Sequence, residues 1–193
     1  MKENNGSLKG YPHAETEELS NPLSYMERET DYLIPAAVEL SINKNNAHNI
    51  KCKAVFEGAN GPTSFAGEEI LLERGIIVSP DLLTNGGGVT CSYFEWLKNL
   101  DHVSPGKMTK KFEEQSMLKL IGLMGLETSD FNVQGATELD IVYTALDEIM
   151  TGAVQENWNY AVEHNLNFRD ACLVNAISKL YKHYKEVGIT LWT

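Results

Sequence analysis

The chain has 193 residues, of which 42% are hydrophobic and 22% are charged, a balance typical of a folded globular protein with a core of its own. This composition excludes a disordered tail or a fibre. The formal net charge of −11 repels phosphate backbones and anionic lipid heads, so we expect neither nucleic acid nor a membrane as the main partner.

The first half of the chain alternates short apolar runs with stretches of helical spacing. Residues 1–30 come before this pattern; they are polar and predict a loop that contains one short strand at residues 7–11. We predict strands at 31–37, 51–56 and 76–78, helices at 64–74 and 90–100, and a short helix or turn at 38–48. Alternation of this kind is typical of a parallel sheet with helical crossovers, so the fold class is α/β.

The second half is helical. Apolar residues recur at helical spacing over 137–163 and 168–187, with Thr137 as the cap of the first helix and Gly188 as the stop of the second. Residues 103–136 are ambiguous. A helix at 112–126 would carry an exposed methionine-rich stripe, which more often packs against a partner than binds a cofactor.

Three conspicuous loops, at residues 35–37, 58–60 and 85–88, follow the predicted strands. Because the carboxyl ends of parallel strands meet at one edge, where such sheets hold their ligands, we expect these loops to gather there. Their asparagine amides can donate and accept hydrogen bonds, and their glycines permit positive φ and close approach of a ligand. Asparagines and glycines that serve only the turns are the alternative.

Three segments in this order and spacing resemble a known family. Residues 57–63 (EGANGPT) are similar to the E-G-A-N-x-P-T loop of glutamate dehydrogenases, which belong with the leucine, phenylalanine and valine dehydrogenases. Residues 80–89 (PDLLTNGGGV) resemble their P-D-x-x-x-N-A-G-G-V segment, with Gly86 in place of the usual alanine. Residues 92–99 (SYFEWLKN) resemble a helix of the animal-type enzymes, and residues 135–142 and 174–177 resemble the family's closing helices.

The resemblance implies a partial Rossmann-like parallel sheet with helices, followed by a C-terminal helical segment. It divides the chain into a polar lead-in (1–30), an incomplete NAD(P)-binding part (31–102), a shortened antenna-like insert (103–136) and C-terminal helices (137–193).

The resemblance also implies a reaction and its ligands. Glutamate is oxidatively deaminated to 2-oxoglutarate and ammonia, with NAD or NADP as cofactor. Ser92 would help to hold the distal carboxylate of glutamate beside an apolar wall formed by Val89, whereas the alternative for Ser92 is a helix cap. The implied cofactor-binding residues are Ala36, Ala37, Gly58, Asn60 and Asn85.

Two motifs of the family do not occur in this sequence. These are the G-x-G-x-x-G loop that holds the pyrophosphate and the glycine-rich segment with the catalytic lysine. We therefore assign no catalytic residue and expect the chain to be inactive alone, as a fragment, a reduced module or a truncated gene prediction. The alternative is a non-catalytic assembly or decoy module, either a homo-oligomer or a partner of full-length subunits. NAD versus NADP, the oligomeric state and allosteric regulation stay open.

Cysteine and histidine usage points to no further chemistry. Cys52, Cys91 and Cys172 are odd in number and widely spaced, which favours reduced intracellular thiols. The five histidines have no metal-ligand spacing, so we expect no metal site. No transit peptide is visible at the start of this sequence. The compartment is therefore the mitochondrial matrix by resemblance, or the cytoplasm.

Overall fold

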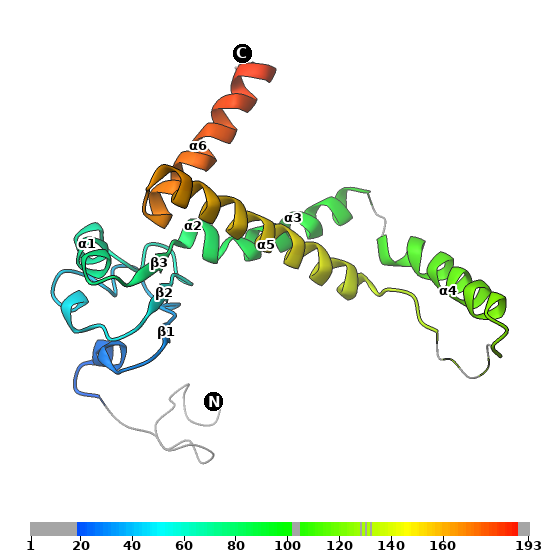
Figure 1. The fold of residues 1–193 in the computed structure, drawn as a ribbon, viewed down its shortest axis with the longest axis horizontal. Coiled ribbons are helices and arrows are strands. Elements are labelled where there is room, and N and C mark those ends of the chain that lie inside the picture. Colours follow the sequence, from blue (N-terminus) through cyan, green and yellow to red (C-terminus); the bar gives the residue numbers. More distant parts are fainter. Residues whose placement is uncertain (1–18, 102–104, 128, 130, 132, 189–193) are drawn as a thin grey trace. The chain divides into compact units, whose positions relative to one another are not determined.

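The computed structural model describes residues 19–101, 105–127, 129, 131 and 133–188. The strand predicted at 7–11 lies outside the described residues. The chain divides into two compact units, residues 1–78 and 79–193. Figure 1 shows that the strands belong to the first part of the chain and the long helices to the second. The four-part division made from the sequence stays a prediction.

A three-stranded sheet with the order β1-β2-β3 forms the first unit and confirms the α/β class. Its strands are β1 (Tyr32–Leu33), β2 (Ala54–Phe56) and β3 (Ile77–Ser79). β1 and β2 are parallel, with Tyr32 opposite Ala54 and Leu33 opposite Val55. The strands are shorter than the apolar runs that predicted them. β1 ends before Pro35, which has no amide hydrogen to donate to a ladder.

The two faces of this sheet differ. One face packs on the short helices α1 (Phe65–Glu73), η2 (Pro22–Glu27) and η3 (Ala47–Asn49). The buried core on that side comprises Met26, Leu33, Ile42, Ala47, Ile50, Val55, Leu71, Ile76 and Val78. The other face carries exposed apolar side chains, among them Tyr32 and Phe56, whose rings meet edge to face at 5.9 Å. η2 lies in the polar lead-in that we predicted to be a loop; Asn21 caps it by accepting a bond from the Leu23 amide.

Local signals explain α1. Ser64 caps its start by accepting a hydrogen bond from the Gly67 amide, and Gly75, with φ of +75°, follows its end as predicted. Arg74 then ties α1 to η3, because its guanidinium donates to the carbonyls of Ala47 and Ile50 at 2.5 and 2.6 Å.

The second unit is helical. Its elements are α2 (Asp81–Thr84), α3 (Gly86–Asp101), α4 (Pro105–Leu123), α5 (Glu138–His164) and α6 (Phe168–Val187). Thr137 and Asp140 form a reciprocal capping box at the start of α5, which confirms Thr137 as its cap. α6 has the predicted bounds and is followed by Gly188 with φ of +80°. The ambiguous insert contains α4, where Met117 is exposed as expected. Among the described residues, no helix is long and apolar enough to cross a bilayer.

Candidate functional site

The loops that follow β1 and β2 are held together by the backbone. The Pro35 carbonyl accepts hydrogen bonds from the amides of Gly58 and Ala59, at 3.1 and 2.9 Å. Residues 35–37 and 58–60 therefore lie side by side at the carboxyl ends of their strands, where we expected loops to gather. Ala36, Ala37 and Asn60 are exposed on these loops, and Gly58 is half-buried.

Gly58 has no room for a side chain. A Cβ added there would lie 2.9 Å from the Cβ of Ala36 and 3.5 Å from the Cγ2 of Ile34. The glycine is thus required by the packing of one loop on the other and not by its φ. The residue with positive φ in this region is Gly61, at +56°, directly after Asn60.

The glycine segment after β3 differs from its prediction. We expected a loop at 85–88, whose glycines permit positive φ, followed by a helix from about residue 90. Instead Asn85 has helical angles (φ −94°, ψ 0°) at the end of α2, and α3 begins at once with Gly86. The Gly88 amide donates to the Asn85 carbonyl at 3.2 Å. A Cβ on Gly87 would lie 3.5 Å from Cδ1 of Leu146, so this first turn packs on α5.

Ser92 and Val89 both lie on α3 and are exposed. Because the helix begins at Gly86, Ser92 lies in its second turn and is not a helix cap. Its hydroxyl donates within the helix, to the carbonyl of Gly88 at 2.8 Å, with the carbonyl of Val89 at 3.3 Å. Residues three apart on a helix share one face, so Val89 and Ser92 are neighbours.

The short helix α2, which presents Asn85, is fixed by contacts that the sequence did not reveal. The hydroxyls of Ser79 and Thr84 are 2.8 Å apart, and Asp81 accepts a hydrogen bond from the Leu82 amide at 2.7 Å. Arg169 at the start of α6 forms an ion pair with Asp81 at 3.5 Å. Sequence reasoning missed Arg169 because its partner lies 88 residues away.

Each unit therefore brings its own candidate residues together. Ala36, Ala37, Gly58 and Asn60 lie on two joined loops of the first unit, and Asn85, Val89 and Ser92 lie on consecutive helices of the second.

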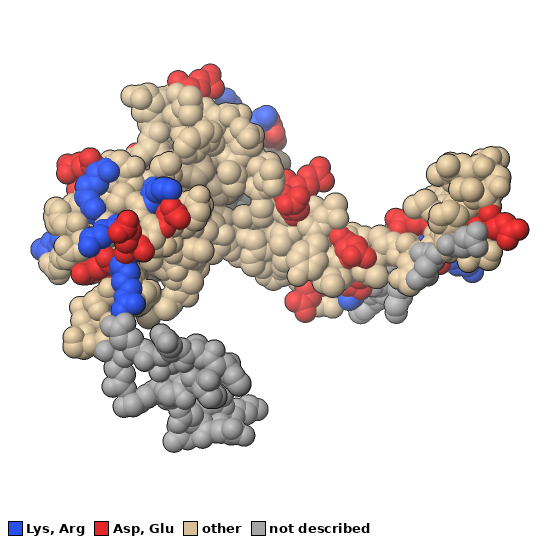
Figure 2. All heavy atoms as spheres, turned by 60° about the horizontal axis from the view of Figure 1, so that its bottom comes forward, with Lys and Arg blue, Asp and Glu red and all other residues tan. Residues whose placement is uncertain are grey.

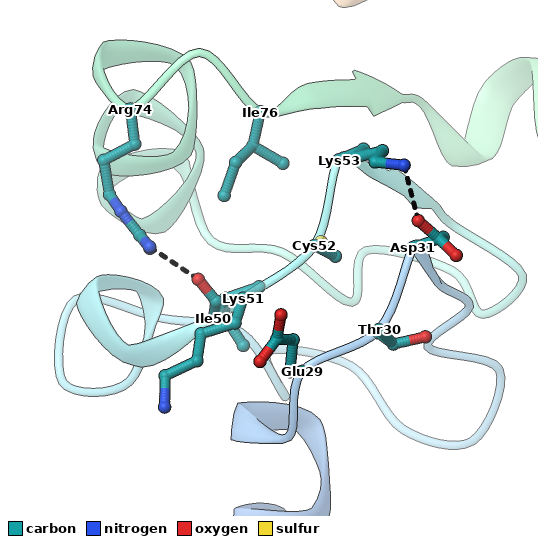
Figure 3. A pocket seen from close by; sticks show the side chains of 9 residues that line it. All are labelled: Glu29, Thr30, Asp31, Ile50, Lys51, Cys52, Lys53, Arg74 and Ile76. Atoms are coloured by element: carbon teal, nitrogen blue, oxygen red, sulfur yellow. Dashed lines mark hydrogen bonds and ion pairs between the residues drawn. The ribbon is translucent and has the colours of Figure 1, made fainter.

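An open hollow lies at the opposite edge of the sheet, lined by residues that precede the strands (Figure 3). Its volume is about 690 Å³. Lys53 pairs with Asp31 at 2.6 Å, and this bond raises the pKa of the lysine. Burial raises the pKa of the Cys52 thiol, which nearby Arg74 opposes only in part, so the thiol is a poor nucleophile at neutral pH. The residues that line this hollow are Glu29, Thr30, Asp31, Ile50, Lys51, Cys52, Lys53, Arg74 and Ile76.

Neither a patch of one charge nor a group of metal-binding side chains accompanies these sites among the described residues. On the face drawn in Figure 2, basic side chains lie among acidic ones and form no patch of their own. Among the described residues, no three histidine, cysteine, aspartate or glutamate side chains come together as a metal-binding group.

Comparison with known proteins connects this chain to dehydrogenases. The family model described as Glutamate/Leucine/Phenylalanine/Valine dehydrogenase matches residues 1–122. A mitochondrial glutamate dehydrogenase of Dictyostelium discoideum is 42% identical over 166 residues, which are 82% of this chain and 33% of that protein. The chain spans about a third of the length of the curated relatives that it matches.

Solved structures agree with this match. The crystal structure of glutamate dehydrogenase from Peptoniphilus asaccharolyticus has a TM-score of 0.58 at 32% identity, covering 80% of this chain and 31% of that one. The hetero-hexameric glutamate dehydrogenase of Thermus thermophilus has a TM-score of 0.67 at 22% identity, covering 89% of this chain and 33% of that one. The second likeness concerns the fold alone.

Proposed function

The chain belongs to the glutamate/leucine/phenylalanine/valine dehydrogenase family, and we propose that it is the nicotinamide-facing part of an NAD(P)-dependent glutamate dehydrogenase. The reaction is the oxidative deamination of glutamate to 2-oxoglutarate and ammonia. The observation that carries the proposal is the pair of strand-end loops, 35–37 and 58–60, joined through the Pro35 carbonyl.

The residues of these loops fit a flat, polar cofactor. Gly58 lets the two loops pack closely together, and the side chains of Ala36 and Ala37 beside it are small and exposed, so a ring can approach the loops closely. The side-chain amide of Asn60 suits the carboxamide or a ribose hydroxyl, because it can both donate and accept, and Asn85 of the second unit is proposed as a cofactor contact from the family resemblance alone. When bound, the cofactor accepts a hydride from the α-carbon of the amino acid.

Ser92 and Val89 are the proposed contacts for the substrate. Val89 offers an exposed apolar side chain to the methylene groups of glutamate. The Ser92 hydroxyl donates to the Gly88 carbonyl, so it must turn away from the helix backbone before it can donate to a carboxylate. Ser92 therefore contributes to substrate binding only after this local rearrangement.

We assign no catalytic residue in this chain and propose that it binds ligand without turning it over. The lysine and carboxylate that move protons in this reaction would come from another segment or another subunit. The runner-up is a non-catalytic module that joins full-length subunits. The exposed apolar side chains at the end of α4 and in the turn that follows it, Leu123 and Met124, favour that reading.

The mitochondrial matrix is the proposed compartment, supported by the Dictyostelium discoideum relative, with the cytoplasm as the alternative. Imaging of the tagged full-length gene product against a matrix marker distinguishes the two.

Calorimetric titration of the chain with NADH and with NADPH tests the cofactor site. Asn60→Ala and Asn85→Ala should each weaken binding by about five- to tenfold, the equivalent of one hydrogen bond. Asn45→Ala, an exposed asparagine in a turn of the first unit, is the matched control and should leave binding unchanged. Equal binding by all four proteins would contradict the assignment of both amides.

Absorbance of the reduced cofactor during incubation with glutamate tests turnover. We expect no rate above the blank. A steady rate that Ser92→Ala abolishes would overturn the proposed inactivity while supporting the substrate site. Thr144→Ala is the control for the lost hydroxyl, because Thr144 also donates to a carbonyl four residues back on an exposed helix.

A further inference from the structure

The chain contains three asparagine–glycine pairs, at residues 5–6, 60–61 and 85–86. The first pair lies outside the described residues, and the other two include the asparagines proposed as cofactor contacts. Asparagine is a thermolabile residue, and it is most labile before glycine, because glycine has no Cβ to hinder attack of its backbone nitrogen on the asparagine side chain. The sequence therefore marks both pairs alike, and their surroundings in the fold must separate them.

The pair at 60–61 is open to water and lies in a non-helical bend. Asn60 and Gly61 are both exposed, and neither belongs to a helix or a strand. Apart from its chain neighbours, a Cβ placed on Gly61 would meet no atom of the described residues within 4 Å. The peptide between the two residues can therefore rotate without opening a helix.

The pair at 85–86 is held in helical geometry. Asn85 has ψ of 0° at the end of α2, both residues are half-buried, and α3 begins at Gly86. The first turn of α3 packs on α5, because a Cβ on Gly87 would lie 3.5 Å from Leu146. The Gly86 nitrogen can reach Cγ of Asn85 only if ψ of Asn85 leaves the helical range. This motion breaks the bond from the Gly88 amide to the Asn85 carbonyl and lifts the turn from α5.

We infer that Asn60 is a site of spontaneous deamidation and that the fold protects Asn85 from the same reaction. The backbone nitrogen of Gly61 gives its proton to hydroxide and attacks Cγ of Asn60, so a nitrogen–carbon bond forms and the Cγ–Nδ2 bond breaks. The leaving group takes a proton from water and departs as ammonia. Water then opens the cyclic succinimide at either carbonyl, which leaves aspartate or isoaspartate at position 60.

Both products change the loop. Aspartate at neutral pH accepts hydrogen bonds but cannot donate them, so position 60 loses its donor and gains a negative charge. Isoaspartate also inserts a carbon atom into the main chain just before a bond that holds this loop, in which the Leu40 amide donates to the Gly61 carbonyl at 2.9 Å. The modification does not depend on the proposed function, whereas its effect on cofactor binding rests on that proposal.

Peptide mapping by mass spectrometry tests the site, with the full chain aged in its folded state at mildly alkaline pH. The peptide with residue 60 should be deamidated at least about tenfold faster than the peptide with residue 85, because the second reaction first requires a hydrogen bond and a packed turn to open. In the denatured chain the two rates should become similar. A rate at residue 60 no higher than at residue 85 in the folded chain would overturn the inference, as would a difference that persists after denaturation.

Asn60→Gln is the matched control, since glutamine keeps the amide but must close a larger ring. Its peptide should stay unmodified over the same period, and an equal gain of mass in this variant would overturn the assignment to Asn60.

The effect on the cofactor is measured separately. The deamidated protein, separated from the fresh protein by anion exchange, is titrated with NADH. Its affinity should fall at least as far as that of Asn60→Ala, and Asn60→Asp, which reproduces one product, should bind NADH as weakly. Deamidation that leaves NADH binding unchanged would contradict the cofactor role of Asn60 and would still support the modification, so the two failures are distinguishable.

Discussion

Replacing Gly58 by alanine tests the contact that joins the two strand-end loops. The new Cβ would lie 2.9 Å from the Cβ of Ala36, closer than real Cβ contacts, and both atoms are fixed directly to backbone. The loops must therefore separate, which strains the hydrogen bonds from Gly58 and Ala59 to the Pro35 carbonyl. Overpacking of this kind costs about 1–3 kcal/mol, and we expect about 2 kcal/mol because no flexible side chain can yield.

Replacing Ala36 by glycine shows whether the loss of stability in Gly58→Ala comes from the clash with Ala36 or from alanine at position 58 in general. In an Ala36→Gly background the nearest remaining atom to the new Cβ is the Cα of residue 36, at 3.4 Å, which is ordinary contact. Gly58→Ala should then cost at least about 1 kcal/mol less than in the wild type, a coupling within the range for residues in contact.

Hydrogen exchange of a peptide covering residues 54–63 measures this locally. A loss of about 2 kcal/mol lowers amide protection roughly thirtyfold at 25 °C. Unchanged protection in Gly58→Ala, or the same loss with and without Ala36→Gly, would refute the packing argument. In that case the glycine would have to be explained by ligand approach alone.

Four further outcomes follow from the described contacts. Arg74→Met should lower the hydrogen-exchange protection of residues 47–52 by about 2 kcal/mol, because the buried carbonyls of Ala47 and Ile50 lose a charged donor. Arg74→Lys should lower this protection less. Equal losses in the two variants would contradict the pair of hydrogen bonds from one guanidinium. Gly86→Ala should raise the melting temperature, since its Cβ meets open space on a helix, and a lower melting temperature would contradict the helical description of residues 86–88. Gly61→Ala should lower the melting temperature by forcing alanine to φ of +56°, and an unchanged value would contradict that conformation. Hydrogen bonds from Thr137 hold the pKa of Asp140 below its ordinary value of 3.8, so the contribution of Asp140 to the stability of α5 is complete above pH 3.8 and is lost as the pH falls through the folded pKa. Helix content followed by circular dichroism should therefore depend less on acid in Asp140→Asn. An unchanged pH profile would count against the capping box of Thr137 and Asp140.

The sequence predicts this fold best where a single residue marks the start or the end of a helix. Thr137 and Gly188 are such residues, and the bounds of α6 agree with the prediction residue for residue. The strands agree less well. An apolar run marks where a chain is buried, but the ladder of β1 is limited by Pro35, so only Tyr32 and Leu33 are assigned to it.

The glycines after Asn85 show where local propensity gives the wrong answer. Three consecutive glycines disfavour a helix by about 1 kcal/mol each relative to alanine, which is why a loop was predicted. The structure forms a helix there because α3 packs on α5 through Gly87, Leu146 and Met150, contacts that span some 60 residues of sequence. Tertiary packing outweighs the local preference, and the same change moves Ser92 from the helix start into its second turn.

The joined loops could be predicted from the sequence and the contacts around them could not. The order of strands and loops places residues 35–37 and 58–60 at one edge, as general α/β geometry requires. The bonds of Arg74, however, reach carbonyls 27 and 24 residues earlier, and nothing local to Arg74 marks them.

The division between residues 78 and 79 also separates the intrinsic chromophores of the chain. All three tryptophans, at positions 96, 158 and 192, follow that boundary, whereas the first unit contains tyrosines and phenylalanines but no tryptophan. Tryptophan emission during denaturation therefore gives no signal from the first unit, which contains the sheet. A single new indole in Tyr32→Trp, where the native ring is exposed beside Phe56, would give the first unit an optical signal of its own. Comparing the two proteins would then show whether the units melt together or one after the other.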